Sequence, residues 1–168
     1  MPILTNKDLE AIKIAKKMKI NNFALSFTNS PKDIFFFNKI LSKERKIIKI
    51  ETKKAVKNIE KILKHCNEIL IDRGDLSKEI NIIEVPKAQR KIQKIANKKD
   101  KKVYIATNLL ESMVSKPYPT RAEINDIYNC LELGADGLVL AAETAVGKWP
   151  LECIKIMSDV IKNYSKAI

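Results

Sequence analysis

The chain has 168 residues, 45% hydrophobic and 31% charged, which is typical of a single globular domain spanning 1–168 and excludes a disordered tail. Its longest apolar runs are about six residues, against the roughly 20 that a membrane span needs, so we expect no membrane partner. The net charge of +12 comes from lysines spread along the chain without interleaved aromatic residues, so we also expect no nucleic-acid partner.

Short runs rich in β-branched residues alternate with segments of helical spacing. In chain order the sequence predicts a helix after Thr5, a strand at Phe23–Phe27, a helix after Ser30, a strand at Ile47–Ile50, a helix from Ala55 to Leu63, a strand at Ile69–Ile71, a helix from Val85 to Ala96, a strand at Val103–Ala106, a helix from Thr120 that stops at Gly134, a strand at Gly137–Leu140 and a last helix from Leu151 to Tyr164. The strands are too uniformly apolar to have a wet face. This pattern favours an α/β fold with a parallel sheet covered by helices.

Polar residues lie within or just after the carboxyl end of each predicted strand. They are Thr28 and Asn29, Glu51, Asp72 to Asp75, Thr107 and Asn108, and Glu143 and Thr144. Functional sites in parallel α/β folds are built at the carboxyl ends of the strands. The agreement of five strand ends therefore predicts a site at this edge of the sheet.

Lys49 and Glu51 project from the same face of their strand, because side chains alternate along it. A lysine in such an apolar strand is either compensated by Glu51 and other anions or lies on an exposed edge strand. Glu51 and Asp75 are hard oxygen ligands of the kind that Mg²⁺ accepts. The Arg73-Gly74 step offers backbone N–H groups that could bind a carboxylate or a phosphate.

The sequence has few residues that could form disulfides, a zinc site or a histidine-based catalytic site. Cys66, Cys130 and Cys153 are odd in number and far apart, so we expect buried free thiols rather than disulfides or a zinc site. His65 is the only histidine and is expected at a helix end. The segment 1–8 lacks the cationic start and apolar run of a secretory signal, so we expect a cytoplasmic location.

Four stretches resemble pyruvate kinase, in matching order and spacing. They are Ile48–Glu51, Arg73–Leu76, Ala106–Thr107 with Leu110–Met113 and Pro119–Glu123, and Glu143–Pro150. The resemblance covers essentially the whole chain. It implies a partial TIM (β/α)₈ barrel of about five parallel strands with covering helices, and Mg²⁺-dependent phosphoryl transfer from phosphoenolpyruvate to ADP, giving pyruvate and ATP as in glycolysis.

The resemblance also implies roles for individual residues. Glu51 and Asp75 match the ligands of a divalent cation, Mg²⁺ or Mn²⁺, and Lys49 matches the ammonium that stabilises the transferring phosphoryl group and the enolate. Thr107 matches a residue that contacts the substrate beside the enolate carbon and takes part in its protonation. The backbone at Arg73, Gly74 and Asp75 matches the loop that binds the substrate carboxylate.

The sequence departs from the family at several positions. Asn29 stands where the family usually has Arg, Asp72 where it has a small residue, Ser77 where it has Gly, and Asn108 where it has Gln. Most of the family's K⁺ site and much of its nucleotide site have no counterpart here. The resemblance therefore implies Mg²⁺ more directly than K⁺, and phosphoenolpyruvate or pyruvate more directly than ADP or ATP.

Five strands cannot close an eight-stranded barrel, so the first and last strands are expected to present unpaired edges. We expect a homo-oligomer, a complementary chain that completes the barrel, or an open half-barrel. Two other functions stay open: an inactive or regulatory barrel fragment that needs a partner chain, and a metal-dependent lyase or aldolase that acts through a pyruvate enolate.

Overall fold

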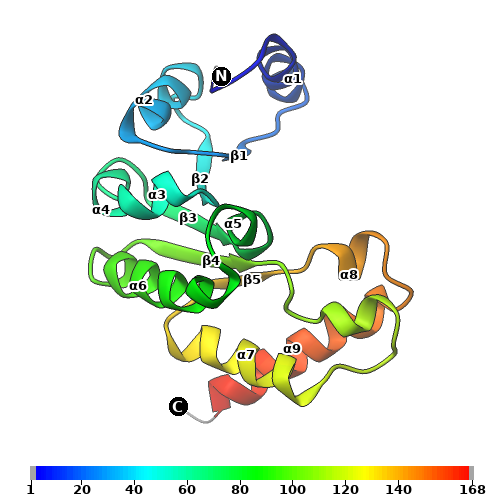
Figure 1. Cartoon of the computed structure of the whole chain (residues 1–168). Helices are drawn as coiled ribbons and strands as arrows, with labels where there is room; N and C mark the ends of the chain where they lie inside the picture. Colours follow the sequence, from blue (N-terminus) through cyan, green and yellow to red (C-terminus); the bar gives the residue numbers. More distant parts are fainter. Residues whose placement is uncertain (1–2, 167–168) are drawn as a thin grey trace.

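The computed structural model of the chain describes residues 3–166 (Figure 1). Met1 and Pro2 lie outside the described residues. They belong to the segment 1–8 that was compared above with a secretory signal. One five-stranded parallel sheet has the strand order β1-β2-β3-β4-β5. Its strands are β1 (Asn22–Leu25), β2 (Arg45–Ile50), β3 (Glu68–Asp72), β4 (Lys102–Ala106) and β5 (Gly137–Val139). The prediction of five parallel strands in an open partial barrel is confirmed.

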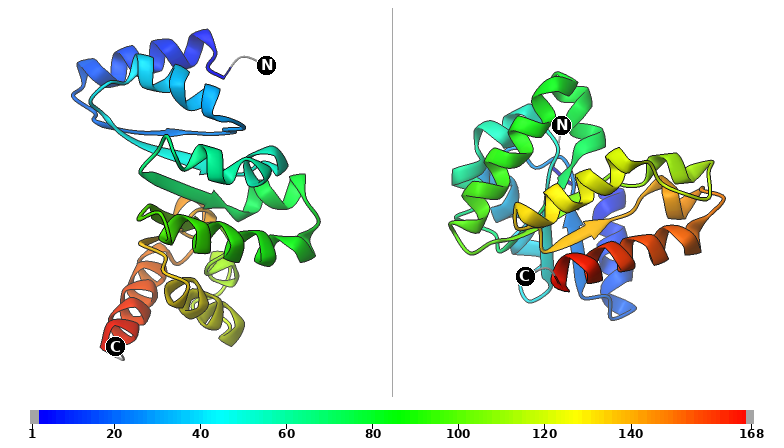
Figure 2. Two further views of the ribbon diagram at one scale, coloured as in Figure 1. Left: turned by 90° about the vertical axis from the view of Figure 1, so that its left-hand side faces the viewer. Right: turned by 90° about the horizontal axis from the view of Figure 1, so that it is seen from below.

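Within residues 3–166, helices lie before β1, between successive strands and after β5. They are α1 (Asn6–Lys17), α2 (Pro31–Ile40), α3 (Lys53–Lys57), α4 (Ile59–Ile62), α5 (Arg73–Glu79), α6 (Val85–Asn97), α7 (Arg121–Glu132), α8 (Ala142–Ala145) and α9 (Pro150–Lys166), with the 3₁₀ helices η1 (Ile82–Glu84) and η2 (Glu111–Val114). Helices α1 and α2 lie at the end of the molecule that carries β1, and α7 and α9 lie at the end that carries β5 (Figure 2). None of the described helices is both long and apolar enough to cross a membrane.

Local sequence signals account for the helix ends. Thr5 and Thr120 form complete capping boxes with the residues three positions on, and Ser30 precedes a proline at the first position of α2. Helix α7 ends just before Gly134, whose φ of +78° lies in the left-handed region that favours glycine. These predicted helix boundaries are confirmed.

Two predicted elements differ from the structure, and one short helix was not predicted. Strand β1 ends at Leu25 rather than Phe27, because Phe27 has a φ of +52° and its N–H donates to the side chain of Glu51 instead of a strand carbonyl. The helix predicted from 55 to 63 is broken into α3 and α4 at Asn58, whose side chain donates to the carbonyl of Asn29 at 2.9 Å. Helix α5 has only seven residues, too few for an apolar period to reveal it.

The two faces of the sheet differ in burial. Ile50, Ile71 and Ile105 lie side by side in register, and all three are fully buried against the helices. On the opposite face, here called the inner face, Lys49 and Tyr104 flank Leu70 in register, and all three are only partly buried. The expectation that neither face is wet is therefore wrong for the inner face, because no described helix covers it in this open sheet.

Candidate functional site

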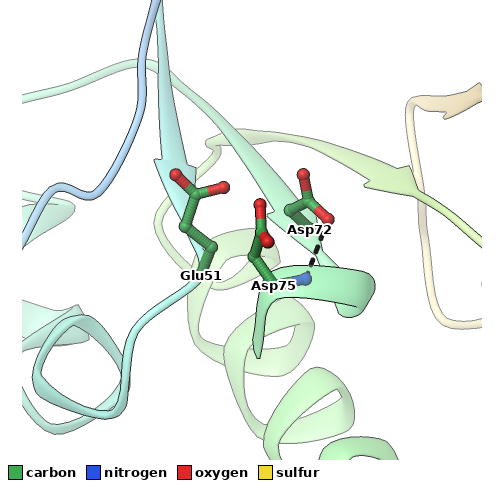
Figure 3. Close-up of side chains that lie close together, drawn as sticks. All are labelled: Glu51, Asp72 and Asp75. Carbon is green, nitrogen blue, oxygen red and sulfur yellow. Dashed lines mark hydrogen bonds between the residues drawn. The ribbon is translucent and has the colours of Figure 1, made fainter. Parts of the chain in front are cut away.

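The register of the sheet brings an ammonium and two carboxylates together. Lys49 in β2 lies opposite Leu70 in β3. Since side chains alternate along a strand, Glu51 and Asp72, two residues further on, point to the same inner face as Lys49. The Asp75 carboxylate joins them from the first turn of α5, and carboxylate oxygens of Glu51, Asp72 and Asp75 lie within 4.8 Å of one another (Figure 3).

The Lys49 ammonium is held between two of these carboxylates. Its Nζ lies 2.8 Å from Glu51 Oε2 and 3.0 Å from Asp72 Oδ2. Burial lowers the pKa of Lys49, but the two carboxylates favour the ammonium more strongly, so its pKa lies above the ordinary value of 10.5. Strand β2 pairs with β1 and β3, so the alternative of an exposed edge lysine is wrong and compensation by anions is confirmed.

Glu51 is fully buried, and its two oxygens have different surroundings. Oε1 accepts the backbone N–H of Phe27 at 2.5 Å. Oε2 has the Lys49 ammonium nearby, but in a direction that gives no hydrogen bond. A buried carboxylate oxygen without a hydrogen bond is unfavourable unless a cation approaches it, and here the Lys49 ammonium does so. With carboxylate oxygens around it, the set of donors fits a hard divalent cation such as Mg²⁺ or Mn²⁺.

Asp72 is part of this cluster, although the sequence predicted it only as one of the polar residues at the strand ends and gave it no ligand role. It is buried, it caps α5, and its Oδ1 accepts the N–H of Asp75 at 3.4 Å. One signal in the sequence points to it: a carboxylate at the last position of an apolar strand. Its place near Lys49 follows from the register, in which Leu70, two residues before Asp72, lies opposite Lys49. Alternation places such a residue on the inner face.

Thr107 follows β4 and reaches the same edge of the sheet. Its φ of +71° is rare for a β-branched residue, and such strain persists where surrounding contacts fix the conformation. The hydroxyl accepts the N–H of Gly74 at 2.7 Å and lies 2.6 Å from the carbonyl of Ala106, to which it can donate. Thr107 is thus fixed against the turn between β3 and α5, and its Oγ1 is 3.4 Å from Asp72 Oδ1.

The Arg73 side chain points away from the Lys49 ammonium. Its guanidinium donates to the carbonyls of Thr107 at 2.6 Å and Asn108 at 3.1 Å, and it pairs with Asp126 at 2.6 Å. It lines a cavity of about 640 Å³ whose walls include neither the Lys49 ammonium nor the three carboxylates. The role predicted for this segment concerns its backbone and stays a prediction. The N–H groups of Gly74 and Asp75 have acceptors within the chain.

The ends of β1 and β5 contribute to structure more than to this cluster. Thr28 is buried, and its hydroxyl donates to the carbonyl of Leu25 at 3.3 Å. Glu143 is also buried and accepts the N–H groups of Leu110 at 3.1 Å and Ala141 at 2.8 Å. Of the five strand ends expected to form a site, those of β2, β3 and β4 come together around Lys49.

Comparison with known proteins identifies the family to which the chain is similar. Residues 1–154 match the family described as pyruvate kinase, barrel domain. A pyruvate kinase of Thermotoga maritima is 46% identical, in an alignment that covers 98% of this chain and 36% of that protein. Pyruvate kinases of Methanocaldococcus jannaschii and Mycobacterium tuberculosis are 39% and 36% identical, over 96% and 95% of this chain and 37% and 35% of those proteins. The chain thus spans about a third of the length of these relatives and, by its match to the barrel domain, belongs to the pyruvate kinase family.

Proposed function

We propose that the chain carries out, in the cytoplasm, the phosphoryl transfer from phosphoenolpyruvate to ADP that gives pyruvate and ATP, with Mg²⁺ or Mn²⁺ as cofactor. The observation that carries this proposal is the Lys49 ammonium set among the carboxylates of Glu51, Asp72 and Asp75 at one edge of the sheet. Membership of the pyruvate kinase family supports the same reaction.

In this proposal Glu51 and Asp75 hold the cation. When bound, the cation supplies positive charge that orients the substrate oxygens and offsets the charge developing on them. Lys49 supplies a second positive charge, which stabilises the phosphoryl group in transfer and the enolate that remains. The ammonium is effective here because the Lys49 side chain is only 20% exposed, so water screens its charge poorly.

Thr107 and the turn from Arg73 to Asp75 position the substrate. The Thr107 hydroxyl, held at the end of β4, takes part in moving the proton at the enolate carbon. The backbone of Arg73, Gly74 and Asp75 binds the substrate carboxylate, which replaces Thr107 Oγ1 and Asp72 Oδ1 as acceptor of the Gly74 and Asp75 N–H groups.

A second candidate is a metal-dependent lyase or aldolase that acts through a pyruvate enolate. It is favoured by the composition of the cluster, because Lys49, Glu51, Asp75 and Thr107 are the groups that handle an enolate, whereas the Arg73 guanidinium is bound within the chain. A third candidate is a fragment that becomes active only with a second copy or a complementary chain. The partly exposed inner face of the sheet favours that candidate.

The test is proton NMR of pyruvate in D₂O with Mg²⁺, which follows loss of the methyl signal as the enolate forms. We expect exchange that requires the cation, is lost in Lys49→Met and is kept in Lys102→Met, a matched control at the exposed start of β4. Formation of ATP from phosphoenolpyruvate and ADP, measured on the same samples, separates the kinase from the lyase. Folded wild-type chain that shows neither exchange nor ATP formation contradicts an activity of the chain alone and favours the fragment.

A further inference from the structure

We propose that Asp72 is a third carboxylate ligand of the divalent cation, and that it holds the Lys49 ammonium in place until the cation binds. This inference rests on the proposed function and deepens it. It goes beyond the pair of ligands implied by the resemblance, Glu51 and Asp75, because the family usually has a small residue at the position of Asp72.

The geometry lets the Asp72 carboxylate reach the same cation as the carboxylates of Glu51 and Asp75. Each of the three offers an oxygen within 4.8 Å of the others, and the side chains of Glu51 and Asp75 lie beside Asp72 (Figure 3). A second sign of a cation site is Glu51 Oε2, which is fully buried, accepts no hydrogen bond and meets its charge only through the Lys49 ammonium 2.8 Å away. Asp72 is itself buried, with 8% of its surface exposed, so its charge is not dispersed into water.

The charge of the cluster fits a divalent cation only when Asp72 is counted. The three carboxylates contribute −3 and the Lys49 ammonium +1, which leaves −2. Without Asp72 the sum would be −1. Lys78 also lies 2.9 Å from an oxygen of Asp75, but its side chain is 77% exposed, and such pairs are weak because water screens them. A cation of charge +2 balances this sum as long as the Lys49 ammonium stays beside the cluster.

Cation binding and the present position of Lys49 compete for the same oxygens. Nζ lies 2.8 Å from Glu51 Oε2 and 3.0 Å from Asp72 Oδ2, within the space that a cation bound by both carboxylates would take. The ammonium is carried on a flexible four-carbon chain and can move aside. Binding of the cation thereby releases Lys49 from its two ion pairs, and the ammonium becomes available to a phosphoryl group or an enolate.

The test is titration of the full chain with Mn²⁺ alone, without substrate, with free Mn²⁺ measured by electron paramagnetic resonance. We expect Asp72→Asn to weaken Mn²⁺ binding about tenfold or more, because ligand charge sets the affinity of such sites. Asp159→Asn, the same change at an exposed position of α9, should leave the affinity unchanged. Lys49→Met should strengthen binding severalfold, because it removes the competing ammonium.

Asn and Ser are both good N-caps, so Asp72→Asn and the second variant Asp72→Ser should preserve the start of α5. Wild-type affinity in either folded variant overturns the proposal. If Glu51→Gln and Asp75→Asn lose Mn²⁺ while Asp72→Asn keeps it, this inference fails and the proposed cation site stands. If the wild-type chain takes up no Mn²⁺ at millimolar concentration, both fail.

Discussion

Lys49 also contributes to the stability of the fold, because its ammonium neutralises carboxylates that would otherwise repel one another where they are buried. We predict that Lys49→Met lowers the free energy of unfolding at pH 7 by about 2–4 kcal/mol in the absence of divalent cations, because Glu51 is then left buried and unpaired. Millimolar Mg²⁺ should restore most of this loss, since it binds the folded state. Urea unfolding with and without Mg²⁺ checks this, and a Lys49→Met chain as stable as wild type contradicts it.

Gly137 is the residue of β5 that lies opposite Tyr104, and the Tyr104 ring packs over it. A Cβ at Gly137 would lie 2.6 Å from the ring, while the Tyr104 hydroxyl is held by Arg45 at 2.6 Å and Glu68 at 3.2 Å. We predict that Gly137→Ala destabilises the chain by about 1–3 kcal/mol through this clash. In urea unfolding, the double variant with Tyr104→Leu should lose less than the sum of the two single variants. Additive losses would show that the ring is not the cause.

Alternation along a strand is why the sequence alone could predict part of the site. It puts Lys49 and Glu51 on one face whatever the rest of the fold does. The direction of the Arg73 side chain could not be predicted in this way, because it is fixed by Asp126, 53 residues further along the chain. The part played by Asp72 depends on the register between β2 and β3, which no local pattern reveals.

At the level of elements, the start of α7 is joined to η2 by one carboxylate. Glu123 accepts the N–H of Thr120 at 2.7 Å and of Ser112 at 2.7 Å. Burial raises the pKa of Glu123. The hydrogen bonds from these two N–H groups and from the hydroxyls of Ser112 and Thr120 lower it by more than burial raises it, so the pKa lies below the ordinary value of 4.5. A carboxyl group with a lowered pKa in the folded state stabilises the fold above its unfolded pKa and loses that effect as the pH falls through its folded pKa.

We therefore predict that Glu123→Gln loses about 1 kcal/mol of stability at pH 7, and that the difference from wild type shrinks below about pH 4.5. Urea unfolding at pH 7 and at pH 3.5 measures both values. Glu132→Gln, at an exposed position near the end of the same helix, is the control. A difference that is the same at both pH values would contradict the role given to the carboxylate.

Elements with clear end signals could be predicted, and short ones could not. The boundaries at Thr5, Thr120 and Gly134 follow from local backbone chemistry and are confirmed. The break at Asn58 depends on a hydrogen bond to the carbonyl of Asn29, which is a contact between distant parts of the chain. The apolar pattern of the sequence continues across Asn58 and gives no sign of the break. Tertiary contacts therefore decide where the pattern is interrupted.

Over the whole molecule, the sheet ends in β5, and an apolar surface lies beside that strand. This surface, here called the β5 surface, surrounds a pocket of about 590 Å³ lined by Leu138, Leu140, Ile154, Met157 and Ile161 among others. We predict that the chain associates with itself as its concentration rises, and that Ile154→Lys weakens this association. Because Ile154 is 53% exposed, the variant should change the free energy of unfolding by no more than about 0.5 kcal/mol.

Sedimentation velocity over a range of concentrations measures this association. Ile83→Lys, the same change at a residue that is 78% exposed on η1, should leave it unchanged. A wild-type chain that sediments as a monomer at every concentration contradicts the prediction and favours a complementary chain of different sequence as the partner.

The strands of the sheet lie in the same order in space as along the chain. Each strand can therefore pair with one that the ribosome has already released, and contacts close in sequence form first. Lys49, Glu51 and Asp72 meet once β3 docks on β2, and Thr107 arrives with β4. The strands that carry these residues leave the ribosome before β5 and α9, so the order of the chain allows the centre to form from its N-terminal side.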